Sequence, residues 1–486
     1  MFRNSDKSQL DKAFNLPFEE SNSNLKLNDG SKVAVIGGGP AGSFMSYFLL
    51  NMSDSYGIDI DVDIFDPQDF SRNGSPGCNH CGGIISESLV RIMAADGINL
   101  PGAIIQTGIE SYMLHMDEGN VKIDTPLHEK RIAAVYRGIG PRGIKEIRWS
   151  NSFDKYLQLL AFNTGAEIIR DRVERIDWNN DFPEVIAKRG SYGKYDLIVG
   201  AVGVNTSALK LFENLDIGYK KPETTKTYIC ELPLDKEQTQ QYLGNSMHLF
   251  LLNIPRLEFA ALIPKGDFVT VVLLGDEIDR DLVRSFLESD EVRGCLPPGY
   301  IVPDKICHCG PRICTTGAVR PFTDRLVMIG DCGVSRLYKD GIGAAYRTAK
   351  TAAAAAVFKG ISAKDFQDQY MPVYKSIAND NKYGKLVFGF TEMIQKTGFA
   401  KKTILRIVRN EQKNDKVPQR LSSVLWDTFT GSAPYKDVFM RFLHPAFIAR
   451  FLWNLMITIL PINGRQEKVK KGEDFEYERI RQDIQP

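Results

Sequence analysis

Three glycines near the start of the chain, Gly37-x-Gly39-x-x-Gly42, have the spacing of a phosphate-binding turn. They follow the branched apolar run 33–36 and lead into a second apolar segment, an order that predicts a strand, a tight turn and a helix. The first glycine permits the turn, the second lets the backbone approach a pyrophosphate, and the third lets the helix pack against the strand. The start of the helix then offers free N–H groups and a positive dipole end to phosphates.

Two further features of the sequence support this interpretation of the motif. Asp66 follows the predicted strand 58–65, at the position where a carboxylate binds an adenosine ribose. The buried strand pattern 195–203 ends at Gly203, and we expect it to return to the same sheet. This context favours a dinucleotide site over a glycine-rich turn that is only structural.

A second glycine-containing motif lies far along the sequence. Gly330-Asp331 follows a buried strand pattern, and Gly341-Ile342-Gly343 precedes an Ala-rich helical run at 346–358. An Asp at such a strand end can bind a ribityl hydroxyl, and the glycine-rich helix start can approach the flavin ring and the pyrophosphate. The two motifs together predict FAD. The predicted FAD-contacting residues are Gly37, Gly39, Pro40, Ala41, Gly42, Asp66, Gly203, Gly330, Asp331, Gly341, Ile342 and Gly343.

The cysteines form the least ordinary pattern in the chain. Cys78-x-x-Cys81 lies in a Gly- and Pro-rich loop after the second strand, and Cys307-His308-Cys309 precedes the Gly-Asp strand. Thiolates at these spacings are ligands of zinc or of iron–sulfur clusters, so Cys78, Cys81, Cys307 and Cys309 are predicted metal ligands. Two alternatives stay open: a lone reactive Cys81 beside the flavin, and a redox disulfide such as Cys309 with Cys332. His115, His128, His248 and His444 show no partner pattern, and we expect core or surface positions for them.

Composition narrows the class of protein. The 486 residues are 43% hydrophobic and carry a net charge of +1, which argues against a chain-wide nucleic-acid surface. Eight clustered cysteines do not form a disulfide scaffold, and the polar N-terminus has no secretory pattern, so we expect a reducing, cytoplasmic location. No window reaches the roughly 18–20 uninterrupted apolar residues of a membrane-spanning helix.

These motifs predict an α/β protein with a discontinuous Rossmann-like FAD-binding domain. We assign that domain to 31–100, 140–205 and 310–380, after a flexible leader at 1–30. Alternating apolar runs predict an inserted antiparallel-sheet substrate domain formed by 101–139 and 206–309. Helical patterns dominate 381–486.

The helical C-terminal region contains a very apolar stretch at 439–460, interrupted by Arg441, Pro445 and Arg450. It predicts an in-plane membrane anchor whose arginines reach lipid headgroups, which places the protein peripherally on the inner face of a membrane. The alternative is a buried helical subdomain or a partner interface. Basic residues precede this stretch: Lys382, Lys385, Lys396, Lys401, Lys402, Arg406 and Arg409.

Residues 31–380 resemble the geranylgeranyl reductase family, which has the p-hydroxybenzoate hydroxylase fold. The resemblance lies in both FAD motifs, in the loop Cys81-Gly82-Gly83 and in the helix start Phe153-Asp154-x-x-Leu157. The segment 195–203 is similar to a family strand, with Val202 in place of the usual Asp. A strand that carries aromatic residues in the family has Ala261 and Ile263 here.

The resemblance implies FAD-dependent reduction of an apolar, membrane-held substrate, either an isoprenoid double bond or a quinone. It implies that Cys81, Gly82 and Gly83 lie at the reacting face of the flavin. The sequence shows no second nucleotide motif, so a protein electron donor is one expectation. Two other functions stay open: an electron-transfer flavoprotein subunit with a metal or iron–sulfur centre, and a flavin monooxygenase.

Overall fold

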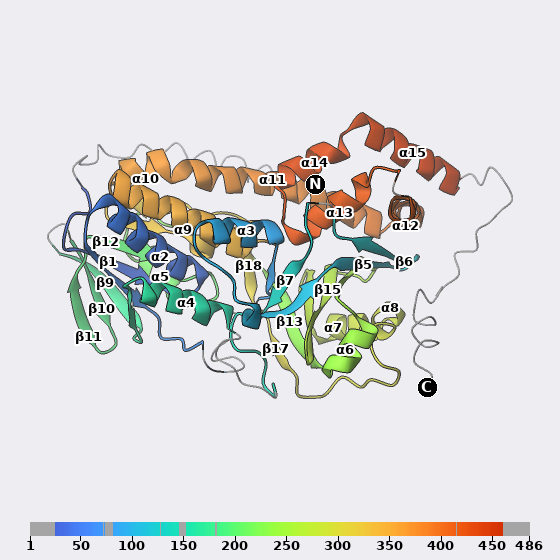
Figure 1. The fold of residues 1–486 in the computed structure, drawn as a ribbon, viewed down its shortest axis with the longest axis horizontal. Helices are drawn as coiled ribbons and strands as arrows, with labels where there is room; N and C mark the ends of the chain where they lie inside the picture. Colours follow the sequence, from blue (N-terminus) through green and yellow to red (C-terminus); the bar gives the residue numbers. More distant parts are fainter. Residues whose placement is uncertain are drawn as a thin grey trace.

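The computed structural model describes residues 25–70, 72, 81–126, 128–144, 152–179, 182–414 and 416–459. Most of the predicted leader and Cys78 lie outside these residues. A parallel sheet with covering helices and a large antiparallel sheet lie at the two ends of the long axis, and the C-terminal helices run along one side of both (Figure 1).

The parallel sheet is assembled from distant parts of the sequence. Its six strands have the order β19-β20-β12-β1-β2-β8, and all neighbours are parallel except β19 and β20. The strands are β1 (Ser31–Ile36), β2 (Ile60–Phe65), β8 (Glu167–Ile169), β12 (Leu197–Gly200), β19 (Phe322–Thr323) and β20 (Leu326–Met328). The predicted Rossmann-like sheet is confirmed, and it combines strands from residues 31–65, 167–200 and 322–328.

Both faces of the central part of this sheet are buried, which explains why residues 33–36 of β1 and all of β12 are apolar without interruption. Val33 and Val35 face the helices α2 (Pro40–Tyr56), α4 (Phe153–Asn163) and α9 (Gly341–Phe358). Ala34 and Ile36 face a three-stranded antiparallel sheet. That sheet and its flanking helix are β9 (Val173–Asn179), β10 (Phe182–Ala187), β11 (Gly190–Lys194) and α5 (Leu209–Glu213).

The second large sheet is antiparallel, as predicted, except that its neighbours β14 and β5 are parallel. Its path is β17-β13-β16-β15-β14-β5-β6, and β18 (Arg312–Cys314) also pairs with β13. The path strands are β5 (Ser111–Met116), β6 (Gly119–Asp124), β13 (Thr224–Pro233), β14 (Ser246–Phe250), β15 (Leu257–Lys265), β16 (Phe268–Gly275) and β17 (Cys307–Cys309). One face packs on α6 (Lys236–Tyr242), α7 (Arg280–Leu287) and α8 (Asp290–Arg293). The other face meets the C-terminal helices.

A small sheet of three strands lies between the two large sheets. It consists of β3 (Ile84–Ile85), β4 (Ile105–Ile109) and β7 (Ile132–Val135). The adjoining helix α3 (Glu87–Ala95) begins at Ser86, whose side chain accepts a hydrogen bond from the Leu89 N–H as an N-cap.

The C-terminal helices are built into both cores. The helix α11 (Met371–Gln395) buries Tyr374 against the parallel-sheet helices and Phe388 against the antiparallel sheet. It follows α10 (Ala363–Gln369), from which it is separated at Tyr370. The remaining helices are α12 (Gly398–Lys413), α13 (Arg420–Thr430), α14 (Tyr435–Phe442) and α15 (Pro445–Ile459).

The apolar stretch predicted as one anchor is two helices. α14 and α15 meet at a bend of 59° and lie along the outer edge of the molecule (Figure 1). No single helix in the described part of the chain is long and apolar enough to cross a bilayer. The bent pair α14 and α15 together has the necessary length and composition. No residue of α15 is buried.

Candidate functional site

A cavity of about 840 Å³ lies between the carboxyl ends of the parallel strands and the antiparallel sheet. This is the place where open α/β sheets bind their ligands. The structure brings most of the predicted site residues to its wall. The predicted residues that line it are Gly37, Gly39, Pro40, Ala41, Asp66, Cys81, Gly82, Gly83, Gly203, Asp331, Gly341 and Ile342.

The first glycine motif has the geometry that its spacing predicts. Gly37 has a φ of +107°, and a Cβ there would lie 2.5 Å from the Ala201 carbonyl oxygen. A Cβ on Gly42 would lie 1.9 Å from the Gly37 carbonyl oxygen, so helix α2 can approach β1 this closely only with glycine. α2 begins without a side-chain cap, and its first turn has no acidic residue. Its N-terminus therefore suits an anion.

Asp66 is held rigidly at the rim of this turn. Its Oδ2 accepts hydrogen bonds from the Gly38 N–H at 3.0 Å and from Gln158 Nε2 at 3.2 Å, and its Oδ1 accepts one from the Gln68 N–H at 2.8 Å. Burial raises the pKa of Asp66 to about 6, although these backbone hydrogen bonds and Arg170 oppose the rise.

Some residues of the second motif line the cavity, and others allow the elements around it to pack closely. Asp331 lines the cavity, and burial raises its pKa, while Ser335 and Arg137 oppose that rise. Three predicted cofactor residues do not line the cavity: Gly42, Gly330 and Gly343. A Cβ on Gly330 would lie 2.8 Å from the Ala41 Cβ, and one on Gly343 would lie 2.1 Å from Asp340 Oδ1. These glycines instead let the elements around the cavity approach one another.

The loop with Cys81, Gly82 and Gly83 lines the cavity. Cys81 Sγ accepts a hydrogen bond from the Gly83 N–H at 3.3 Å. Arg137 pairs with the buried Asp154 at 2.9 Å; burial lowers the pKa of Arg137, but Asp154 and Cys81 outweigh it and raise the pKa overall. Gly83 has a φ of +70°, and a Cβ there would lie 1.9 Å from the Val135 carbonyl oxygen.

The other predicted metal ligands lie elsewhere. Cys307 and Cys309 are on β17, opposite Glu231 and Ile229 of β13, and do not line the cavity. In the part of the chain that the structure describes, Cys81, Cys307 and Cys309 form no group of three adjacent ligand atoms, and no disulfide joins Cys309 to Cys332. Because Cys78 is outside that part, the four-thiolate site stays a prediction.

The apolar end of the cavity contains a lysine that no sequence pattern predicted. Lys339, in the loop before α9, places Nζ 3.9 Å from the ring centre of Phe429 and 4.9 Å from that of Phe259. Burial, with a smaller contribution from Arg336, holds the pKa of Lys339 well below its usual range. The apolar lining residues are Met247, Leu249, Phe259, Ala261, Ile263, Val272, Leu274 and Phe429.

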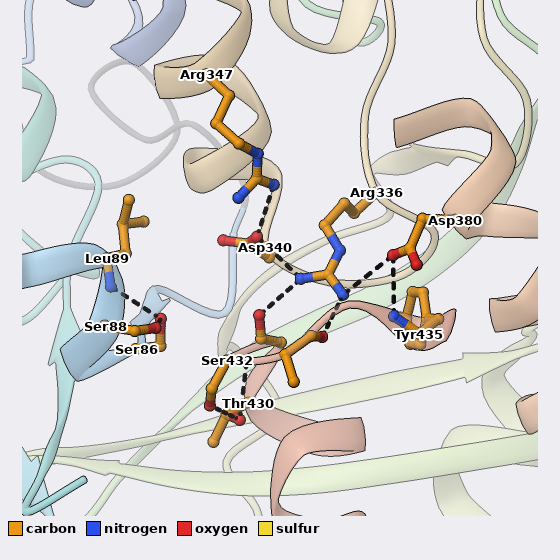
Figure 2. Close-up of polar contacts among 12 residues, drawn as sticks. Ser86, Ser88, Leu89, Arg336, Asp340, Arg347, Asp380, Thr430, Ser432 and Tyr435 are labelled. Atoms are coloured by element: carbon orange, nitrogen blue, oxygen red, sulfur yellow. Dashed lines mark hydrogen bonds and ion pairs between the residues drawn. The ribbon is translucent and has the colours of Figure 1, made fainter. Parts of the chain in front are cut away.

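Arg336 fixes the loop that carries Lys339. Its guanidinium donates to the Gly431 carbonyl oxygen at 2.6 Å, to the Ala433 carbonyl oxygen at 2.7 Å and to Asp340 at 3.1 Å. It also pairs with Asp380 of α11 at 3.4 Å. Figure 2 shows this guanidinium between the start of α9 and the C-terminal helices. The Arg336 side chain therefore connects the cavity wall to the C-terminal region.

The sequence matches no protein-family model and no curated relative. Solved structures nevertheless share the fold. A flavoprotein/dehydrogenase from Cytophaga hutchinsonii is 14% identical with a TM-score of 0.60, over 89% of this chain and 99% of that one. The halogenase PltM, in complex with phloroglucinol and FAD, is 12% identical with a TM-score of 0.56, over 88% and 91%.

A third structure extends the comparison. The flavin-dependent halogenase CmlS is 19% identical with a TM-score of 0.53, over 81% of this chain and 72% of its own. The structural similarity to these proteins establishes the fold, but sequence identities this low leave the reaction open. The parallel sheet, the antiparallel sheets and the C-terminal helices together make the p-hydroxybenzoate hydroxylase-type flavoprotein fold.

Proposed function

We propose that this chain is an FAD-dependent oxidoreductase that binds an apolar substrate beside the flavin in one continuous cavity. The observation that carries the proposal is that continuity: the phosphate-binding end and the apolar end share a single space of about 840 Å³. Pockets that bury most of a small ligand have volumes of roughly 300–1,000 Å³. The solved complex of PltM with FAD and phloroglucinol supports a similar use of this fold.

The residues at the phosphate-binding end fit FAD. The uncapped start of α2 offers N–H groups to a pyrophosphate, and Asp66 is the acceptor for the adenosine ribose. Asp331, beside the start of α9, is the acceptor for the ribityl chain. When bound, FAD supplies two-electron transfer at its isoalloxazine ring.

The apolar end restricts the substrate. Its walls are aliphatic and aromatic, and Lys339 is the amine that projects among the phenylalanine rings. A buried amine with a lowered pKa can accept a proton from a substrate hydroxyl at Nζ and later return it. We therefore favour an apolar substrate with at least one weakly acidic hydroxyl, such as a phenol or a hydroquinone.

We propose that the reaction is oxygen-dependent, as in a flavin monooxygenase or halogenase. Support comes from the structural neighbours, which include the halogenases PltM and CmlS and the brominase Bmp2. The second candidate is the reductase of an isoprenoid double bond or quinone. It is favoured by Cys81, Gly82 and Gly83, because this loop lines the same cavity.

One experiment separates these reactions. The FAD-loaded protein is reduced chemically without oxygen and mixed with phloroglucinol, a quinone or a geranylgeranyl lipid, then divided between air and anaerobic conditions. We expect a hydroxylated or halogenated phenol in air, with halide present for the latter, and no product without oxygen. Anaerobic saturation of the lipid or reduction of the quinone would instead establish the reductase.

FAD binding is tested with a pair of glycine variants. A Cβ on Gly341 meets Ser335 and Asp331 only at 3.5 and 3.7 Å, so Gly341→Leu can fold but fills the cavity. Gly389 is also helical, and a Cβ there meets nothing within 4 Å, so Gly389→Leu is the matched control. We expect purified Gly341→Leu to lose bound FAD and the control to keep it. Equal FAD content in a folded Gly341→Leu would overturn the assignment.

We also propose that α14 and α15 dock on an anionic lipid surface. Leu452 and Trp453 of α15 are 56% and 59% exposed, and Lys382 and Lys385 are exposed on the adjoining α11. Apolar residues with Trp and neighbouring basic residues favour a bilayer interface. The arginines of this stretch point inward instead: Arg441 pairs with Asp427, and Arg450 with Glu411 at 3.3 Å.

A further inference from the structure

Two histidines and a cysteine meet on the side of the antiparallel sheet that faces away from the cavity. His115 lies on β5, His248 lies on the neighbouring β14, and Cys295 follows α8. Met247 and Leu249 line the cavity, and because side chains alternate along a strand, His248 between them points to the opposite face. The group is therefore separate from the proposed FAD site and needs its own explanation.

The three side chains present one ligand atom each to a common point. His115 Nε2 lies 3.0 Å from His248 Nδ1, which lies 3.2 Å from Cys295 Sγ. The third side of the triangle, from Cys295 Sγ to His115 Nε2, is 3.7 Å. Tetrahedral zinc, with Zn–N of about 2.0–2.1 Å and Zn–S of about 2.3 Å, places its ligand atoms roughly 3.3–3.6 Å apart. The observed spacing matches that to within a few tenths of an ångström.

The surroundings orient the imidazoles as ligands. His248 Nε2 lies 3.3 Å from the Leu243 carbonyl oxygen, so this nitrogen carries the proton and Nδ1 presents its lone pair to the group. The ring of His115 stacks on Phe250 with centres 4.6 Å apart.

Hydrogen bonding alone is the competing explanation. Cys295 Sγ can donate to the Glu291 carbonyl oxygen at 3.3 Å, which would satisfy the thiol. Yet all three side chains are buried in a core with Leu243 and Phe250, where polar groups contribute little unless their interactions are strong. A cation provides stronger interactions for both imidazole lone pairs and for the sulfur.

We propose that His115, His248 and Cys295 bind one Zn²⁺, with water at the fourth position. Thiolate and imidazole are the ligand types that zinc prefers in proteins. Among the described residues, no fourth His, Cys, Asp or Glu joins the group. Binding replaces the thiol proton of Cys295, so one proton leaves for each zinc ion that enters. The centre joins β5, β14 and the segment after α8.

Metal content of the full-length protein, purified without an affinity metal and dialysed against a weak chelator, tests the proposal. We expect about one zinc per chain. Cys295→Ser and His248→Asn should each lower it by roughly tenfold or more, because two ligands hold zinc poorly. The double variant Cys307→Ser/Cys309→Ser should keep its zinc, which separates this centre from the predicted thiolate site. Circular dichroism and FAD content verify that each variant is folded.

A measurement on the unmodified protein covers the case in which a variant does not fold. Cobalt substituted for zinc should show a thiolate-to-metal absorption band, and strong chelation should lower the melting temperature until zinc is restored. A wild-type protein that takes up no zinc would overturn the proposal. So would zinc retained in Cys295→Ser and His248→Asn, or copper in place of zinc.

Discussion

The Nζ atom of Lys339 lies 3.9 Å from the centre of the Phe429 ring, inside the cavity and across the boundary between two distant parts of the chain. Lys339 belongs to the loop before α9, whereas Phe429 belongs to α13. The ring faces of Phe429, Phe259 and Phe388 each favour a charged amine, by about 2 kcal/mol at a desolvated site. The cost of burying an ammonium ion is greater than this gain, so the neutral amine is favoured.

The first prediction concerns catalysis by Lys339. Lys339→Met keeps the volume of the side chain but removes the proton-carrying nitrogen, and we expect kcat to fall by roughly 10²–10⁴-fold. Bound FAD should be unchanged, because Lys339 lies at the apolar end of the cavity. Lys359→Met, at the exposed far end of α9, is the control. Unchanged kcat in Lys339→Met would exclude Lys339 from the proton transfer.

The second prediction concerns stability and pH. The pKa of Lys339 is lower in the folded protein than in the unfolded chain, so the unfolded chain binds more protons between the two values. At pH values below the pKa of Lys339 in the folded protein, the full loss of stability is present. The loss shrinks as pH rises above that pKa, and it disappears above the ordinary lysine pKa of about 10.4. Lys339→Met should therefore be more stable than wild type near neutral pH. Denaturant unfolding at several alkaline pH values should show that advantage shrinking; an advantage that grows with pH would contradict the assignment.

The third prediction concerns the Arg336 contacts. Arg336→Met leaves Asp380 and two carbonyl oxygens without their buried partner, and we expect a loss of about 3–5 kcal/mol in the free energy of unfolding. Arg347→Met removes a half-exposed arginine with one bond of 3.0 Å to Asp340, and its expected cost is about 0–1 kcal/mol. Chemical denaturation of both variants measures the difference. Similar losses would show that Arg336 does not fix the loop.

The fourth prediction concerns the lipid surface. Trp453→Asp places a charge on the exposed face of α15 and should lower binding to anionic vesicles by about tenfold or more. Ile301→Asp alters a residue that is 83% exposed on another part of the molecule, and it should bind as wild type does. Vesicle co-sedimentation provides the measurement. If wild type does not sediment but dimerises, and Trp453→Asp abolishes the dimer, α15 instead binds a second copy of the chain.

Helix termini show how far local patterns reach. At α3 the Ser86 side chain caps the Leu89 N–H, a contact between neighbours in sequence. The expectation that Arg441 and Arg450 reach lipid headgroups depended instead on contacts between residues far apart in sequence. Their partners, Asp427 and Glu411, lie on other helices, and only the packing of those helices turned the arginines inward. Lys401 is likewise buried against Asp117.

The sequence by itself determined the parallel sheet and its glycine turns. A backbone φ of +107° at Gly37 and the close contact of Gly42 with a carbonyl oxygen both require glycine. These requirements are local, so the spacing of the glycines in the sequence reveals them. The tertiary structure decided which distant side chains meet: Lys339 with Phe429, and His115 with His248 and Cys295. Those contacts depend on strand register and on helix packing across long sequence separations, and no local pattern encodes either.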